Sequence, residues 1–235
     1  MREATGTVRA ADARAGTGDL VIRVDGRRPL SAGSVAAIAA VCDKAEDRGD
    51  DSRVIVHVSG APVRSWTSEL NVALVSKWER GLRRLERLPA ATIAVAAGDC
   101  GGLALDVLLA ADYRIAATSV RLLVAVEAGA TWPGMALYRL SHHAGAAAIR
   151  QAVLFGIPIE AGDALALHLI DELTDDAAGA LAAAAELAGA FSGAELAIRR
   201  QLMLDAPTAS FEDALGVHLA ACDRALRRAS AGAPR

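Results

Sequence analysis

The chain has 235 residues, of which 25 are Lys or Arg and 28 are Asp or Glu, so its net charge is -3 at neutral pH. Hydrophobic residues make up 53% and charged residues 23%, which excludes an intrinsically disordered chain. The length predicts one globular domain, or one domain with a helical appendage. Aromatic residues are only 3%, so we expect no nucleic acid partner, and the uncharged apolar runs are too short to span a bilayer, so we expect no membrane partner.

Residues 1–18 lack a hydrophobic period, so we expect a disordered N-terminal segment there. Beyond it, short apolar runs rich in β-branched residues end in turn residues, which is typical of buried strands. These runs are residues 19–24, 53–59, 92–97, 113–116 and 121–126. Helical patterns separate the first three runs, one through residues 35–42 with Ser31 and Ser34 as candidate caps, the other over residues 70–88 before Pro89. This alternation predicts an α/β core with right-handed crossovers.

From Pro133 onward the pattern becomes almost wholly helical. We expect helical segments around residues 144–155, 161–168, 181–191, 194–204 and 211–228. The predicted organisation is therefore a disordered segment over residues 1–18, a core over residues 19–175, and a C-terminal helical region over residues 176–235.

The cysteines and histidines predict no metal site and no disulfide framework. Cys42, Cys100 and Cys222 are widely spaced without a CxxC pair, which fits a reducing cytoplasm, and the first residues lack the apolar stretch of a secretory signal. Cys100 is expected to be a small apolar residue, because no base accompanies it. The five histidines form no recognisable ligand set, and motifs for phosphate loops, dinucleotide folds, nucleophile elbows and zinc proteases are missing from the sequence.

The segment most indicative of chemistry is TIAVAAGDCGGLALDVLLAAD, residues 92–112. A buried strand ends at Gly98, and Gly101 and Gly102 open an apolar helix whose first backbone N–H groups lack helical partners, so they can hold an anion or oxyanion. Asp106 lies within the apolar run, and a buried carboxylate there must be paired, protonated or engaged in chemistry. The alternative is that Asp106 is solvated or salt-bridged and that the glycines only allow tight packing.

These residues also carry a family resemblance. The run LPAATIAVAAGDCGGLALDVLLAADYRIA, residues 88–116, resembles the signature of the crotonase (enoyl-CoA hydratase/isomerase) superfamily. The Pro133-Gly134 turn, the Arg139-Leu140 pair and the segment GIPIEAGDA follow in the family order. Together with VIRVDGRRPLSAGSV and RVIVHVSG near the front of the chain, these matches extend the resemblance over about residues 19–175. It implies a crotonase (ClpP/crotonase-like) fold, in which a spiral of ββα turns is followed by C-terminal helices that form trimers.

The resemblance further implies an acyl-coenzyme A pocket, in which two backbone N–H groups hold the thioester oxygen while carboxylates move protons at the α and β carbons. By register the donors are Leu103, where most members carry glycine, and Leu70, in a loop that departs from the family. Asp106 falls on the first catalytic glutamate of the hydratases. The second falls on Val126, so its neighbour Glu127 is either a second catalytic acid or a solvated loop acid, because adjacent strand residues point to opposite faces.

The remaining implied contacts are with the substrate. Gly101 and Gly102 allow its close approach, and Arg28 and Arg64 lie where the resemblance places coenzyme A contacts, since guanidinium groups suit phosphate. Both arginines have ordinary solvated positions as the alternative. Trp132 either covers the acyl pocket or packs beside the following proline.

The leading hypothesis is an enzyme that hydrates, dehydrates or isomerises an acyl-CoA, with a polyketide-derived aryl-acetyl-CoA precursor in antibiotic biosynthesis as the specific candidate. It requires no cofactor beyond the coenzyme A of its substrate, and a homotrimer or hexamer is expected. The alternative is a low-turnover binding subunit with a polyketide synthase as partner, and a crotonase-fold hydrolase is a lesser third option. Asp106 discriminates between the first two, because a salt-bridged side chain directed away from the pocket would favour the partner role.

Overall fold

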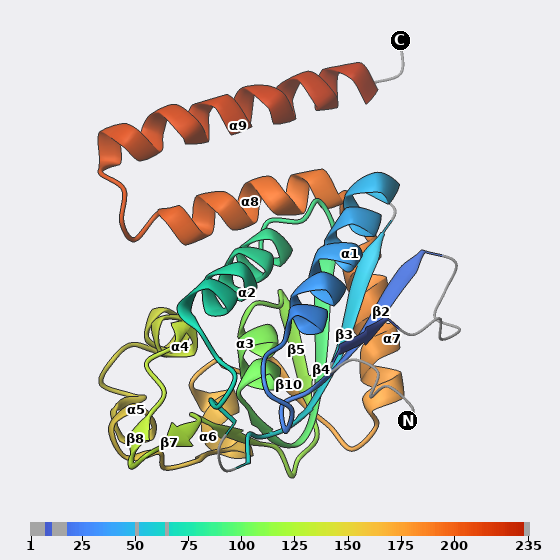
Figure 1. Ribbon diagram of the computed structural model, residues 1–235. Coiled ribbons are helices and arrows are strands. Elements are labelled where there is room, and N and C mark those ends of the chain that lie inside the picture. Colours follow the sequence, from blue (N-terminus) through green and yellow to red (C-terminus); the bar gives the residue numbers. More distant parts are fainter. Residues whose placement is uncertain (1–7, 11–17, 50–51, 64–65, 233–235) are drawn as a thin grey trace.

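The computed structural model describes residues 8–10, 18–49, 52–63 and 66–232 (Figure 1). Its central sheet has the strand order β1-β2-β3-β4-β5-β10, in which β1 is antiparallel to β2 and the other neighbours are parallel. These strands are β1 (Val8–Ala10), β2 (Asp19–Asp25), β3 (Arg53–Gly60), β4 (Ala91–Gly101), β5 (Tyr113–Ala116) and β10 (Glu172–Leu173). The long strand β4 also pairs with β6 (Arg121–Leu123), which in turn pairs with β9 (Ile159–Glu160).

Helices cover both faces of this sheet. The first face packs against α1 (Ala32–Arg48), α2 (Val72–Leu85) and α3 (Leu103–Leu109), with Ile22 of β2 and Trp78 of α2 fully buried between the layers. The second face buries Val21, Ile55 and Ile93 against α7 (Ala177–Gly189) (Figure 1). Residues 176–235, expected as one C-terminal helical region, therefore have two roles in the structure. Helix α7 packs against the sheet as part of the core, and only the helices after it lie outside the core.

Side-chain caps determine where the crossover helices begin. Ser31 accepts a hydrogen bond from the Ser34 N–H at 3.2 Å and starts α1, and Asn71 accepts from the Leu74 N–H at 2.9 Å and starts α2. Each cap satisfies an N–H that has no partner inside the helix. The helix expected over residues 70–88 therefore begins later, at Val72, and it ends at Leu85. The helix expected over residues 35–42 begins earlier, at Ala32, and continues to Arg48.

Three expectations about elements need correction. The expected disordered segment 1–18 contains β1, whose backbone pairs with β2, so the expectation is wrong for residues 8–10. The expected strand 121–126 ends at Leu123, because β6 pairs only with the last three residues of β4, and β7 (Val126–Glu127) pairs with β8 (Ala130–Thr131). The expected helix 144–155 is interrupted at Gly145, where φ is +79°, between α4 (Met135–Ala144) and α5 (Arg150–Phe155).

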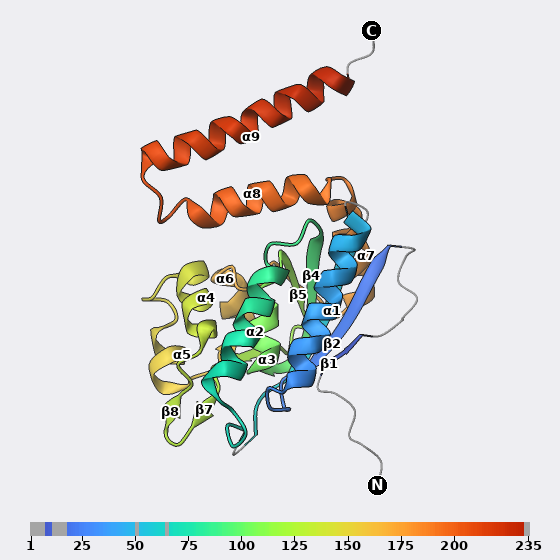
Figure 2. The ribbon, with the colours of Figure 1, turned by 45° about the horizontal axis from the view of Figure 1, so that its top comes forward.

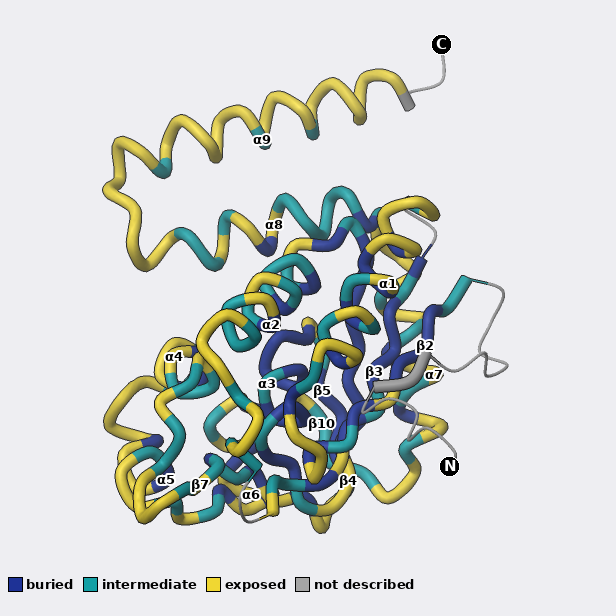
Figure 3. Tube along the Cα trace, viewed as in Figure 1, coloured by how far each residue is buried: buried dark blue, intermediate teal, exposed yellow. Residues whose placement is uncertain are grey.

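The last part of the chain lies outside the layered core. After α6 (Ala161–Ala166) and α7, the helices α8 (Gly193–Asp205) and α9 (Phe211–Gly232) lie alongside each other, with α9 away from the sheet (Figures 1 and 2). Figure 3 shows α9 as mostly exposed. Apolar residues of this helix, among them Phe211 and Leu226, are exposed as well. In the described residues, no single helix is long and apolar enough to span a membrane, and α7 with α8 pass that test only as a pair bent by 93°.

Candidate functional site

A small cavity of about 40 Å³ lies where the carboxyl ends of β2, β3 and β4 meet α2, α3 and α4. Its wall brings together most of the residues predicted to form a site. Arg28, Leu70, Gly102, Leu103, Asp106 and Trp132 all line it, together with Leu30, Pro62, Trp66, Val75, Trp78, Glu79, Leu105, Val124, Ala125, Gly134, Ala136 and Leu137. Residues far apart in the chain therefore meet at one cavity.

The turn at the end of β4 forms one side of this cavity. Ser59 of β3 pairs with Ala97, but the next residue, Gly60, pairs with Cys100, so β4 contains an irregularity just before the turn. Gly102 has φ of +53°, and a Cβ atom at this position would lie 2.6 Å from Cγ of Pro62. Glycine is therefore required here, because the backbone is left-handed and Pro62 packs directly against it.

The turn presents one of the two predicted oxyanion donors. Leu103 is the first residue of α3, so its N–H has no acceptor within the helix, and its side chain lines the cavity. Gly101 does not line the cavity, and a Cβ there would lie 3.0 Å from Cβ of Ala61, so its part is tight packing. Leu70 lines the cavity, but its N–H donates to the Thr67 carbonyl at 2.9 Å. Its use as the other donor requires this turn to open.

Asp106 extends from α3 into the cavity and is the acid that the sequence singled out. Trp78 donates its indole Nε1–H to Oδ2 of Asp106 at 3.1 Å, and no salt bridge to Asp106 is present among the described residues. Burial raises the pKa of Asp106 to about 7, with a further rise from the negative charge of Glu79, against lowering by Arg139 and the Trp78 hydrogen bond. A carboxyl group that titrates near neutral pH suits proton transfer in either direction.

A second carboxyl group in the cavity, that of Glu79 on α2, was missed from the sequence. Nη1 of Arg139 donates to Oε2 of Glu79 at 2.9 Å, and Nε of the same arginine donates to Oε1 of Glu86 at 2.7 Å. Burial raises the pKa of Glu79, and Arg139 acts in the opposite direction. The available signal was the position of Glu79 next to Trp78, at the border of the buried stripe of α2.

Aromatic residues gather at the same cavity. The chain has three tryptophans, and all of them, Trp66, Trp78 and Trp132, line it. Trp66 and Trp132 meet edge to face with ring centroids 5.2 Å apart. Gly134 leaves room for the Trp132 ring, since a Cβ there would lie 2.7 Å from Cδ1 of Trp132. Of the two alternatives for Trp132, the structure thus shows the ring at the pocket wall.

Of the other predicted site residues, Glu127 lies away from the cavity wall and Arg28 lies at the cavity rim. Glu127 does not line the cavity; it pairs with Ala130 in the β7–β8 hairpin, and its Oε2 is buried without a hydrogen-bond partner among the described residues. Arg28 lies at the rim with an exposed side chain, 4.0 Å from the carboxylate of Asp25. Arg64 lies outside the described residues.

Asp112 and Arg114, near the end of the run that carries the family resemblance, stabilise the fold and do not line the cavity. Asp112 accepts hydrogen bonds from the N–H and the hydroxyl of Thr92, both at 2.9 Å, and pairs with Arg200 of α8 at 2.6 Å. Arg114 pairs with Asp171 at 3.4 Å. Cys100 is fully buried, and burial raises the pKa of its thiol, as expected for a packing residue.

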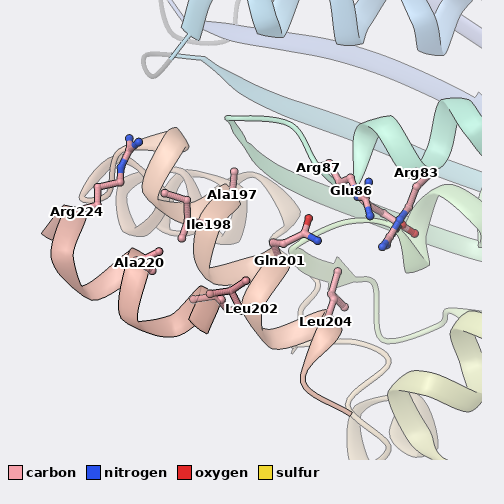
Figure 4. A pocket seen from close by; sticks show the side chains of 12 residues that line it. Arg83, Glu86, Arg87, Ala197, Ile198, Gln201, Leu202, Leu204, Ala220 and Arg224 are labelled. Carbon is pink, nitrogen blue, oxygen red and sulfur yellow. Dashed lines mark hydrogen bonds and ion pairs between the residues drawn. The ribbon is translucent and has the colours of Figure 1, made fainter. Parts of the chain in front are cut away.

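Two larger hollows lie outside this cavity. A groove of about 470 Å³ runs between the end of α2 and the helices α8 and α9, lined by Arg83, Ile198 and Gln201 among others (Figure 4). Another hollow of about 620 Å³ contains His142, His143 and His168. Among the described residues, no group of three or more His, Cys, Asp or Glu is arranged to hold a metal ion.

Comparisons with known proteins place the chain in a family. No protein-family model matches it. A protein of Amycolatopsis orientalis named enoyl-CoA-hydratase is 59% identical over 211 residues, which cover 90% of this chain and 97% of that protein. A probable enoyl-CoA hydratase of Mycobacterium avium is 40% identical over 99 residues, or 41% of this chain and 38% of that protein.

Solved structures show the same fold at low sequence identity. The enoyl-CoA hydratase from Polaromonas sp. JS666 superposes with a TM-score of 0.80 at 17% identity, over 97% of this chain and 94% of that chain. The Mycobacterium smegmatis enoyl-CoA hydratase gives a TM-score of 0.78 at 16% identity, over 94% and 91% of the two chains. The expected crotonase fold is thus confirmed, and the chain belongs to the crotonase (enoyl-CoA hydratase) superfamily.

Proposed function

We propose that this protein transforms acyl-CoA thioesters by hydration, dehydration or isomerisation through an enolate held at the start of α3. The observation that carries the proposal is the cavity placement of Asp106, a carboxyl group with a pKa of about 7, three residues after the Leu103 N–H. A donor to the thioester oxygen and an acid/base group near the α and β carbons are the two requirements of this chemistry.

The chain's own residues supply each part of the proposed reaction. The Leu103 N–H donates to the thioester oxygen and stabilises the negative charge that develops there. Asp106 delivers or removes a proton at the carbon skeleton, and Trp78 orients its carboxyl group through the 3.1 Å hydrogen bond. The guanidinium of Arg28, which is exposed at the rim, binds a phosphate of coenzyme A. Arg64, outside the described residues, is proposed to bind coenzyme A phosphate as well.

Substrate binding must enlarge the cavity. Ligand pockets typically measure roughly 300–1,000 Å³, whereas this one measures about 40 Å³. Trp66 lies in the loop before α2, and its ring meets that of Trp132 at the cavity wall. We propose that these two indoles move apart to admit the acyl group, and that the turn at Leu70 opens with them.

Three tryptophans at one cavity support an acyl group with a flat apolar face. A polyketide-derived aryl-acetyl-CoA is the specific candidate, and the sequence resembles the auxiliary crotonase of dihydroxyphenylglycine biosynthesis, which would place the reaction in antibiotic biosynthesis in the cytoplasm. The small cavity and the engaged Leu70 N–H favour a second candidate, a low-turnover subunit that binds acyl-CoA and serves a polyketide synthase.

A homotrimer, or a hexamer made from two trimers, is part of the proposal. Helix α9 is mostly exposed (Figure 3), and the apolar residues Phe211, Leu219 and Leu226 on it are 74%, 57% and 68% exposed. Surfaces of this kind are usually covered in an assembly.

A panel of acyl-CoAs tests the function. Enoyl-, β-hydroxyacyl- and aryl-acetyl-CoA would each be titrated by calorimetry and incubated with the protein, with products separated by chromatography and identified by mass. Conversion of at least one thioester supports the enzyme, whereas binding without conversion supports the partner subunit. Lack of binding by every thioester would overturn both.

A further inference from the structure

The cavity contains two carboxyl groups from different elements, Asp106 of α3 and Glu79 of α2. Trp78 and Glu79 are consecutive residues of α2, and each makes one hydrogen bond at the cavity. The indole of Trp78 donates to Asp106, and the carboxylate of Glu79 accepts from Arg139. Helix α4, through Arg139, thus reaches the same site. The crotonase reaction needs a proton donor and a proton acceptor, and this cavity offers one candidate for each.

The two carboxyl groups have different partners. Asp106 receives a neutral indole N–H, whereas Glu79 receives a guanidinium that is itself buried, with Arg139 only 6% exposed. A cation stabilises the ionised form of its partner far more than a neutral donor does. Of the two groups, Asp106 is therefore the one that holds a proton more readily and Glu79 the one that ionises more readily, which matches the direction in which the charge of Glu79 raises the pKa of Asp106.

Arg139 is in turn held by a second acid. Glu86 accepts from Arg139 Nε at 2.7 Å and from Arg83 at 3.1 Å, and Glu86 does not line the cavity. Two nitrogens of the Arg139 guanidinium thus donate to two different acids: Nη1 to Glu79, which lines the cavity, and Nε to Glu86, which does not. This arrangement fixes the Glu79 carboxylate in place, as a general base requires.

We propose that Glu79 is the second catalytic carboxyl group of this protein, acting as the proton acceptor opposite Asp106, and that Glu127 has no part in the reaction. The inference rests on the proposed acyl-CoA function. It assigns to helix α2 a role for which the sequence resemblance offered only Glu127, as one of two alternatives.

Addition of water to an enoyl thioester would use both carboxyl groups, one to accept a proton and one to donate a proton. The Glu79 carboxylate takes a proton from water as the water oxygen bonds to the β carbon, and the π electrons pass to the thioester oxygen at the Leu103 N–H. The enolate then takes the proton of Asp106 at the α carbon. The proton on Glu79 returns to Asp106, so one water is added and both groups regain their initial states.

The experiment compares Glu79→Gln, Glu79→Asp and Glu127→Gln, with Glu186→Gln on the exposed face of α7 as the matched control for loss of one negative charge. Each variant is assayed on the acyl-CoA that the wild type converts, together with its melting temperature and its affinity for the same thioester. We expect Glu79→Gln to lower kcat by roughly 10² to 10⁴ with affinity changed less than about threefold, and the other two Gln variants to stay within about twofold of wild type.

Two results would overturn the inference while leaving the proposed function intact: a folded Glu79→Gln that keeps more than about a tenth of wild-type kcat, or Glu127→Gln losing as much as Glu79→Gln. If Glu79→Gln does not fold, Glu79→Asp decides, since it keeps the charge for Arg139. A folded Asp variant with kcat lowered about tenfold or more supports the assignment, and one with full turnover refutes it. If the wild-type protein converts none of the thioesters, the proposed enzymatic function is refuted, and the inference is refuted with it.

Discussion

Replacing Asp106 by Asn should change stability in a way that depends on pH. The pKa of this carboxyl rises from 3.8 to about 7 in the folded protein, chiefly because the group is buried. The folded state therefore binds the proton more tightly than the unfolded chain, so ionisation of Asp106 destabilises the fold. The destabilisation is absent below about pH 4, grows as the pH rises towards 7, and stays constant above that.

The size of the destabilisation follows from the rise in the pKa of Asp106 on folding. One pKa unit corresponds to about 1.36 kcal/mol, so the full destabilisation is on the order of 4 kcal/mol, of which about 2.5 kcal/mol develops between pH 5 and pH 8. The asparagine side chain in the Asp106→Asn variant keeps the shape and still accepts from the Trp78 indole but carries no charge. The difference in unfolding free energy, variant minus wild type, should thus increase by about 2.5 kcal/mol over this range.

Paired thermal melts at several pH values measure this difference. In a chain of this size, 2.5 kcal/mol corresponds to about 5–10 °C in melting temperature, and any pH-independent effect of the new amide cancels because only the change with pH is compared. Glu186→Gln, an exposed charge removal, serves as control and should show a flat difference. A difference that stays constant or shrinks from pH 5 to pH 8 would refute the burial of an ionisable Asp106.

Other consequences of the structure can be measured alongside. Gly102→Ala should lower stability by about 1–3 kcal/mol, because of its positive φ and the contact with Pro62, whereas Gly162→Ala on α6, with open space around it, should be neutral or slightly stabilising in the same melts. Arg200→Met should lower the unfolding free energy by about 3–5 kcal/mol in denaturant titrations, because it leaves Asp112 partly buried without its cation; a loss below about 1 kcal/mol would contradict this. Coenzyme A thioesters should bind more tightly than the corresponding free acids in calorimetry, because the nucleotide supplies remote binding energy, and equal affinity would count against an acyl-CoA site. Light scattering should report a trimer or hexamer, and a stable monomer at micromolar concentration would contradict the proposed assembly.

The layered core was predictable because its signals are local. Runs such as residues 53–59 and 92–97 are apolar for most of their length, as strands covered on both faces must be, and Ser31 is a cap whose pattern lies within four residues of its helix. Where an element depended on a distant partner, the expectation failed. The split after Leu123 follows from the short pairing of β6 with the end of β4, which no local pattern encodes.

In the candidate site, too, residues with a local sequence signal could be predicted, and residues that depend on a distant partner could not. Asp106 and Gly102 were identifiable, since an acid in an apolar run and paired glycines before a helix are unusual in themselves. Glu79 was not, because a glutamate on an amphipathic helix is ordinary until Arg139, sixty residues later, is placed against it. The register placed the second glutamate position on Val126, so Glu127 was considered only as its neighbour, and its place in the β7–β8 hairpin keeps it out of the cavity wall.

The most direct test of the proposed chemistry is turnover by Asp106→Asn on an acyl-CoA that the wild type converts, measured with affinity for the same thioester. We expect kcat to fall by roughly 10² to 10⁴ while the affinity stays within about threefold, because the amide keeps the shape and cannot transfer the proton. A folded Asp106→Asn protein with wild-type turnover would contradict the assignment of this carboxyl group as the acid/base of the reaction.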